Sequence, residues 1–260
     1  ASCLVGSEMC IRDSGHTDEA KKEVKALFDG TAPFDTPKPT RLLERILTIA
    51  TESDSYVLDF FSGSATTAHA VMKKNTEDGG NRKYILVQLP EKSNSPQYAT
   101  LCEIGKERIR RAAKKIAEEN PKAKFDGGFR VLKLDSSNMK DVYYNPEDFY
   151  SYFLDNLVDN IKEDRTPEDL LFQVMLDLGI LLSSKIEESV IGGKKVFNVE
   201  NNYLIACFDE NVTEDVITEI AKHKPYYFVM RDSSMANDSV ATNFEQIFAA
   251  YSPDTVRKVL

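Results

Sequence analysis

The sequence lacks the features of a metalloprotein, a secreted protein and a membrane protein. Its four cysteines include no C-x-x-C pair and its three histidines are far apart, so a Cys/His metal site is not expected. We interpret the cysteines as reduced thiols of a cytoplasmic protein. No apolar run approaches the roughly 20 residues that span a bilayer. The first residues lack the basic and apolar regions of a signal peptide.

An excess of positive charge is also missing. Lysine and arginine number 33 against 42 aspartates and glutamates, which gives a formal net charge of −9. A protein that grips duplex DNA normally presents a basic surface to the phosphates. Either nucleic acid is not a ligand of this chain, or the surface that would bind it lies outside these 260 residues.

The chain is long enough for one large or two modest domains. Residues 1–14 fit no periodic pattern and do not begin with Met, so we interpret them as a non-native, adaptor-like segment. The alternative is a short native strand. Beyond them we expect a first domain at 15–140, an acidic and aromatic linker at 141–165, and a second domain at 166–260.

The first domain shows the alternating pattern of an α/β protein. In chain order the predicted elements are helix 17–28, a helix capped by Thr40, strand 56–61, helix 65–75, strand 84–89, helix 99–118 and strand 129–134. The strands are continuous apolar runs, which are typical of strands buried on both faces of a parallel sheet. The order β-α-β-α-β therefore predicts a doubly wound parallel sheet.

The second domain is predicted to be a small α/β unit. Thr166-Pro167-Glu168-Asp169 is a strong helix start, and Gly179 is expected to end or weaken that helix. A hairpin joined through Asn201-Asn202 follows. The remaining predicted elements are strands 195–199 and 203–208 of that hairpin, a helix near 213–223, strand 226–230, a helix near 242–250 and strand 256–260.

A strand that runs into Asp59, then a turn of small residues, then a helix is the layout of a pocket for a nucleoside-bearing cofactor. Gly63 lets the backbone approach a ligand closely, since a Cβ would collide. Hydroxyls and free N–H groups at the helix start can hold a carboxylate or phosphate, and the hydroxyls here are Ser64, Thr66 and Thr67. A phosphate-binding P-loop and a dinucleotide Gly-x-Gly-x-x-Gly are both absent. The alternative is a plain strand-to-helix turn.

Flanking strings extend this pattern to a known family. The chain from about 15 to 260 resembles the C-terminal part of the modification subunit of type III restriction–modification systems. The strings that carry the resemblance are Phe34–Leu43, Lys83–Glu91, Gly105–Ala112, Lys133–Asn138, Ala206–Asp209, Arg231-Asp232, Glu245–Phe248 and Ser252–Thr255. The resemblance implies an S-adenosylmethionine-dependent DNA adenine-N6 methyltransferase of the permuted β class. It also implies a partial Rossmann-like sheet followed by a small α/β domain for subunit assembly.

The resemblance assigns cofactor-binding residues by position. The family's cofactor motif falls on Asp59, Phe60, Phe61, Ser62, Gly63, Ser64, Thr66 and Thr67, and its second cofactor segment falls on Lys38 and Pro39. The acid that holds the ribose hydroxyls in related enzymes is replaced by Gln88, so we divide that contact between Gln88 and Glu91. Ala65 stands where many members have glycine.

The family's catalytic motif is missing from the chain. Neither Asp-Pro-Pro nor Asn-Pro-Pro occurs, and Asn145-Pro146-Glu147 lacks the second proline and the aromatic residue. That motif seats the extruded base, so we expect no catalytic residue here and a chain that is part of a longer enzyme. Implied partners are DNA, through missing regions, a second modification subunit and a restriction subunit. The alternatives are a non-catalytic interaction module and a fragment of a cytosine-N4 methyltransferase.

Three further expectations concern single features. The basic residues of helix 99–118, among them Arg108, are interpreted as a solvated face paired with Glu103 and Glu107. His69 is interpreted as a packing residue and Arg231-Asp232 as a loop ion pair. The edge of the strand at 57–61 is expected to be bare and apolar, which favours association.

Overall fold

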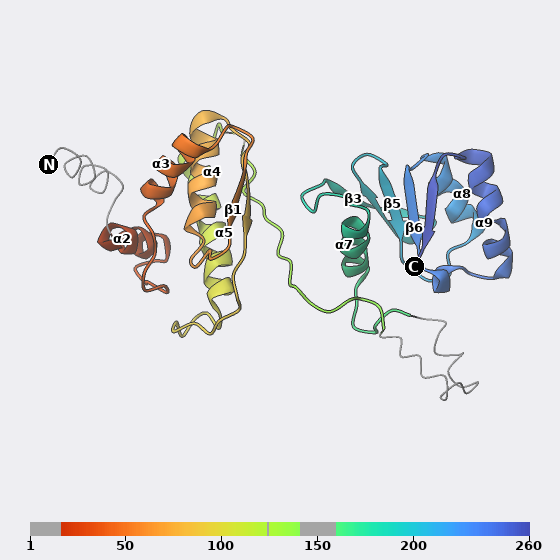
Figure 1. Ribbon diagram of the computed structural model, residues 1–260, viewed down its shortest axis with the longest axis horizontal. Helices are drawn as coiled ribbons and strands as arrows, with labels where there is room; N and C mark the ends of the chain where they lie inside the picture. The colour runs from red at the N-terminus through yellow and green to blue at the C-terminus, as the bar shows by residue number, and fades with distance from the viewer. Residues whose placement is uncertain (1–16, 124, 141–159) are drawn as a thin grey trace. The chain divides into compact units, whose positions relative to one another are not determined.

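The computed structural model describes residues 17–123, 125–140 and 160–260. The chain divides into two compact units, Ala1–Leu132 and Lys133–Leu260 (Figure 1). The segment 1–14, the string Asn145-Pro146-Glu147 and most of the expected linker at 141–165 lie outside the described residues.

The first unit is built around two parallel strands, β1 (Tyr56–Asp59) and β2 (Lys83–Leu86). Its helices are α2 (Thr17–Leu27), α3 (Thr40–Ala50), α4 (Thr66–Asp78) and α5 (Leu101–Glu119). The helix α4 connects the two strands and packs on the sheet, with α3 and α5 beside it (Figure 1). Ala68, Val71 and Met72 are buried on α4. The described part of the unit is therefore a mixed α/β layer with its core on the helix side.

The strands differ from the prediction because only one face of the sheet is covered by the described residues. Inward side chains such as Val57 and Leu86 pack against the helices. Alternate residues on the other face are 45–66% exposed, and they form what we call the open face: Tyr56, Leu58, Phe60, Ile85, Val87 and Leu89. The prediction of strands buried on both faces is thus wrong for the chain as described.

Two other predictions for this unit are corrected. Residues 129–134 form no strand, and the side chain of Leu134 is 99% exposed. An apolar run becomes a strand only where a neighbouring strand accepts its backbone hydrogen bonds, and no described strand does so here. Thr40 does not cap α3, because the N-cap residue is Pro39 and Thr40 is the first residue of the helix.

The second unit is a three-layer α/β structure. Its sheet has the strand order β3-β4-β5-β6-β7, with β3 to β5 antiparallel and β5 to β7 parallel. The helix α7 covers one face, and α8 and α9 cover the other (Figure 1). The elements are α7 (Pro167–Asp177), β3 (Ile186–Ile191), β4 (Lys194–Val199), β5 (Leu204–Cys207), α8 (Glu214–Lys222), β6 (Tyr227–Met230), a 3-10 turn η2 (Asp232–Ser234), α9 (Asp238–Tyr251) and β7 (Val256–Val259).

Most predictions for the second unit are confirmed. Thr166 forms a capping box with Asp169 at the start of α7, and Gly179 follows that helix with φ +68°. The hairpin of β4 and β5 is present, with positive φ at Asn201 and Asn202. The strand β3 was not predicted, although the Gly192-Gly193 turn that joins it to β4 is a recognised hairpin signal.

Candidate functional site

The turn after β1 and the end of β2 meet at one edge of the parallel sheet. The Val87 amide donates to the Asp59 carbonyl at 2.9 Å, and the Ser62 amide donates to the Val87 carbonyl at 3.2 Å. The Gly63 amide donates to Oε1 of Gln88 at 2.7 Å. Four predicted cofactor residues, Asp59, Ser62, Gly63 and Gln88, are therefore joined in one network. The side chain of Gln88 stabilises the conformation of the turn. This structural role comes in addition to the predicted ribose contact.

The carboxylate of Asp59 organises the start of this turn. Its Oδ1 accepts from the Phe61 amide at 3.1 Å, and its Oδ2 accepts from the hydroxyl of Thr67 at 2.5 Å. An ionised carboxylate has about four lone-pair sites, so these two bonds leave capacity for donors of a ligand. Beside it the aromatic side chains of Phe60 and Phe61 are exposed, Phe61 to 91%.

The backbone of the turn takes left-handed conformations at Gly63 (φ +50°) and at Ala65 (φ +60°). A Cβ built on Gly63 would lie 3.1 Å from Cζ of Phe34. A side chain of the chain itself, that of Phe34, thus lies against Gly63, and the close approach of a ligand to this glycine stays a prediction. Ala65 is the N-cap residue of α4 and adopts a conformation that glycine enters more readily.

The hydroxyls of Ser64 and Thr66 point to Arg108 of α5. Nη1 of Arg108 donates to Oγ of Ser64 at 2.8 Å and to Oγ1 of Thr66 at 2.7 Å. Nη2 donates to Oγ1 of Thr40 at 3.3 Å, and the side chain is fully buried. Assigning Arg108 to a solvated face is therefore wrong. The signal was in the sequence, since Arg108 is four residues from both Ile104 and Ala112, and residues four apart share a helix face.

The other basic residues of α5 behave as expected. Nε of Arg111 lies 2.7 Å from Oε1 of Glu107, and Arg110 lies 3.7 Å from the same carboxylate. Burial lowers the pKa of Arg108 to about 10, and the nearby carboxylate of Glu23 opposes this shift. Arg108 is thus an exception on a helix where Arg110, Arg111, Lys114 and Lys115 pair with carboxylates at or near the surface.

The structure does not bring every predicted residue to the turn. Lys38 and Glu91 are exposed, and among the described contacts neither side chain joins the network of the turn. Pro39 is buried at the start of α3, next to Thr40. The link between this second segment and the turn is made by the bond from Arg108 to Thr40.

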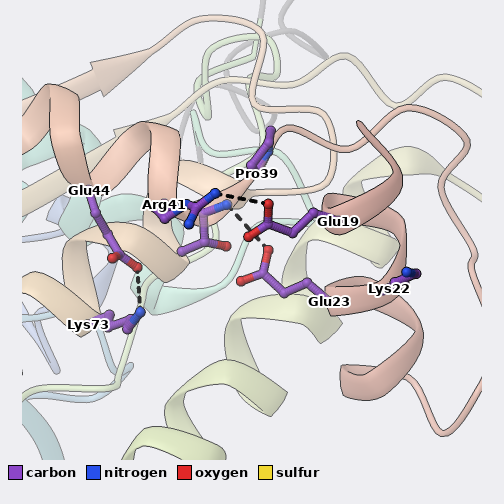
Figure 2. Close-up of a pocket in the computed structure, with 8 residues that line it drawn as sticks. Glu19, Lys22, Glu23, Pro39, Arg41, Glu44 and Lys73 are labelled. Carbon is purple, nitrogen blue, oxygen red and sulfur yellow. Dashed lines mark hydrogen bonds and ion pairs between the residues drawn. The ribbon is translucent and has the colours of Figure 1, made fainter. Parts of the chain in front are cut away.

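A cavity of about 340 Å³ lies between α2, α3 and α4 (Figure 2). Arg41 pairs with Glu19 at 3.2 Å, Lys73 pairs with Glu44 at 2.8 Å, and the Thr40 amide donates to Glu23 at 3.3 Å. The lining residues are Glu19, Lys22, Glu23, Pro39, Thr40, Arg41, Glu44 and Lys73. With three acidic and three basic side chains, the cavity selects neither sign of ligand charge, and of the predicted cofactor residues it contains Pro39 alone.

His69 is buried on α4, in agreement with a packing role. Burial, and then the positive charge of Arg108, lower the pKa of His69 to about 3. Its Nδ1 has no hydrogen-bond partner among the described residues. The imidazole is therefore neutral at physiological pH.

The buried His69 is expected to make the first unit less stable in mild acid. The unfolded chain binds a proton near pH 6.5 while the folded one does not, so stability falls as pH drops below that value. Between about pH 7 and about pH 5 the loss should be about 2 kcal/mol. Urea unfolding at the two pH values, monitored by hydrogen exchange of the amides of α4, measures this loss of unfolding free energy. His69→Gln should remove this loss, whereas substitution of the exposed His223 should not; equal behaviour of the two variants contradicts the assignment.

Comparison with known protein families shows a match for the first unit. Residues 11–115 match the model of a family described as DNA methylase. This segment contains the turn at Asp59, the end of β2 and Arg108. No group of residues suited to a metal ion occurs in the described part of the chain. No helix there is long and apolar enough to cross a membrane.

The most informative relatives are modification subunits. The chain is 48% identical over 122 residues to the type III restriction-modification enzyme StyLTI Mod subunit of Salmonella typhimurium. This aligned region covers 45% of the chain and 19% of the relative. It is 34% identical over 198 residues to the EcoP15I Mod subunit of Escherichia coli, covering 72% of the chain and 29% of the relative. A type II methyltransferase of Klebsiella pneumoniae, M.KpnI, is 42% identical over 83 residues, covering 32% of the chain and 19% of the relative.

These matches confirm the resemblance that the motifs predicted: the chain is a relative of the modification subunits of type III restriction–modification enzymes. The aligned regions span 19% to 29% of the length of these curated relatives.

Proposed function

We propose that the first unit is the S-adenosylmethionine-binding half of a DNA adenine-N6 methyltransferase, and that its two strands are part of a doubly wound, Rossmann-like sheet. The observation that carries the proposal is the network at one sheet edge, in which Asp59, Gly63 and Gln88 shape a single turn. Ligands of open α/β sheets bind beyond the carboxyl ends of the strands, which is where this turn lies.

The groups at the turn suit such a cofactor. Asp59 has lone pairs left for an amine or hydroxyl group of the ligand. The exposed rings of Phe60 and Phe61 offer apolar faces to a purine. Gln88 and Glu91 follow β2, where the ribose contact is expected. When bound, S-adenosylmethionine supplies an electrophilic methyl group; the residues of this chain bind and orient it.

The remaining parts of the proposal rest on the relatives. The acceptor amine would be seated by an Asp-Pro-Pro-Tyr motif that these residues do not contain, so the chain by itself is proposed to bind cofactor without transferring the methyl group. DNA would be bound through other regions of a longer protein, in line with the net charge of −9. We assign the second unit to assembly with a second modification subunit and with a restriction subunit.

Titration of the full chain with S-adenosylmethionine, followed by calorimetry, tests the proposal. Saturable binding is expected, and Asp59→Ala should weaken it at least 30-fold, about 2 kcal/mol, because a charged hydrogen-bond partner is lost. If the wild-type chain is folded and does not bind S-adenosylmethionine, the proposed cofactor site is refuted. The alternative of a non-catalytic interaction module then remains.

Thr67→Val is the matched control for this experiment. It removes the internal donor to Asp59 and keeps the carboxylate. If Asp59 contacts the cofactor, Thr67→Val should weaken binding far less than Asp59→Ala. Equal losses would contradict a cofactor contact specific to Asp59, because Thr67, itself a predicted cofactor residue, would then matter as much.

A further inference from the structure

We propose that Arg108 is a positioning residue that couples the two segments of the cofactor site, the turn at 62–67 and the start of α3 that follows Lys38 and Pro39. The inference rests on the proposed function, since it concerns the same site. It gives a role to a fully buried residue that is not among the predicted cofactor-binding residues.

The guanidinium of Arg108 joins two different elements. It donates to three hydroxyls: those of Ser64 and Thr66 at the start of α4, and that of Thr40 at the start of α3. Arg108 itself lies in the middle of α5, 42 to 68 residues away along the sequence. The planar fork of arginine can donate in several fixed directions at once, so it sets the distance between the elements that it joins.

The buried positive charge of Arg108 is only partly compensated. The carboxylate of Glu23 lies 3.9 Å from Nη2, and the side chain of Glu23 is 32% exposed. Nε of Arg108 has no hydrogen-bond partner among the described residues. The guanidinium also contacts the first residues of two helices, α3 and α4, where the helix dipoles disfavour a cation.

These costs separate Arg108 from an ordinary packing residue. An apolar side chain of similar volume would fill the same space without the desolvation penalty of a buried ion. What it could not do is hold the hydroxyls of Thr40 and Ser64 in a fixed relation. The polar contacts of Arg108 converge on the predicted cofactor segments, which is the pattern expected of a group that preorganises a binding site.

Arg82 supplies a matched control in the same unit. Its side chain is also buried, donates to Thr51 and Asn75, and pairs with Asp78 at 3.0 Å. None of these partners belongs to the predicted cofactor segments. Replacing Arg82 should therefore cost stability without a specific loss of cofactor affinity.

The experiment compares Arg108→Met, Arg82→Met and the wild-type full chain. Calorimetric titration with S-adenosylmethionine is expected to show at least a tenfold loss of affinity for Arg108→Met and less than a threefold loss for Arg82→Met. Arg108→Lys should not restore affinity, because an ammonium lacks the planar fork that joins both elements. Unchanged binding by Arg108→Met, or equal losses in the two methionine variants, overturns the inference.

Hydrogen exchange provides a second measurement that does not need the cofactor. In Arg108→Met, protection should fall both at the amides of Ala65 and His69, at the start of α4, and at the α3 amide of Leu42. Loss at one of the two places alone contradicts the coupling. If the wild-type chain binds no cofactor, the proposed function fails, while this measurement still decides whether Arg108 couples the segments.

If Arg108→Met does not fold, Thr40→Val tests the same coupling. It removes the contact to α3 and leaves the bonds to Ser64 and Thr66. A few-fold loss of affinity and faster exchange at Leu42 are expected. Wild-type values for both measurements would count against the coupling.

Discussion

Replacing Gly63 with alanine is expected to lower the free energy of unfolding of the first unit by about 2–4 kcal/mol. The backbone at this position has φ +50°, a conformation that costs a residue with a Cβ about 1–2 kcal/mol. The new methyl group would also lie 3.1 Å from Cζ of Phe34, closer than ordinary van der Waals contact. Urea unfolding, followed by hydrogen exchange of the amides of α4, measures the loss.

Gly79 separates the two causes. It has φ +70°, and a Cβ built there meets nothing within 4 Å. Gly79→Ala should therefore cost only the backbone strain, about 1–2 kcal/mol. Adding Phe34→Leu to Gly63→Ala should recover part of the larger loss, because the flat ring is replaced by a side chain that can move aside. Equal losses for the two glycines would contradict a specific contact between Gly63 and Phe34.

Local signals allowed much of the fold to be predicted. The capping box at Thr166 and Asp169 fixes the start of α7 with neighbouring residues alone. Apolar spacing on α2 and α4 predicts the buried face of each helix. The position of the candidate site followed from the strand, turn and helix around Asp59, which are also contiguous in the chain.

Other features depend on distant residues and could not be read from local patterns. An apolar run shows that a strand can be buried, but it does not show how many of its faces are covered. The described residues cover β1 and β2 on one face of the sheet. The run at 129–134 has a strand pattern and no described neighbour to pair with. The contact between Gly63 and Phe34, nearly 30 residues earlier, also depends on a distant residue, while the close approach of a ligand to Gly63 stays a prediction.

Arg108 illustrates a different limit. Its charge suggested a solvent-exposed position, while its spacing on the helix placed it with Ile104 and Ala112 in the core. The spacing was the better guide, because a long polar side chain can be buried where hydroxyls accept its hydrogen bonds. Without the positions of Ser64 and Thr66 in space, the sequence could not show that such acceptors were present.

The open face of the β1–β2 sheet is expected to drive self-association of the chain. Six large apolar side chains gather there, and each strand also has an edge with no partner strand among the described residues. Contiguous apolar patches and bare strand edges both favour contact between molecules. The bare edge of β1 was predicted from the sequence, and the structure adds an exposed apolar face next to it.

A paired substitution tests this expectation without changing the net charge. Leu58 and Ile85 are cross-strand neighbours on the open face, so Leu58→Lys combined with Ile85→Glu places opposite charges side by side. Sedimentation velocity over a concentration series should show association of the wild-type chain and at least a tenfold weaker association of the double variant. Leu176→Lys with Leu181→Glu is the control, because these leucines are each 62% exposed and lie in the other unit. A wild-type chain that stays monomeric, or a control pair that weakens association equally, contradicts the role of this face.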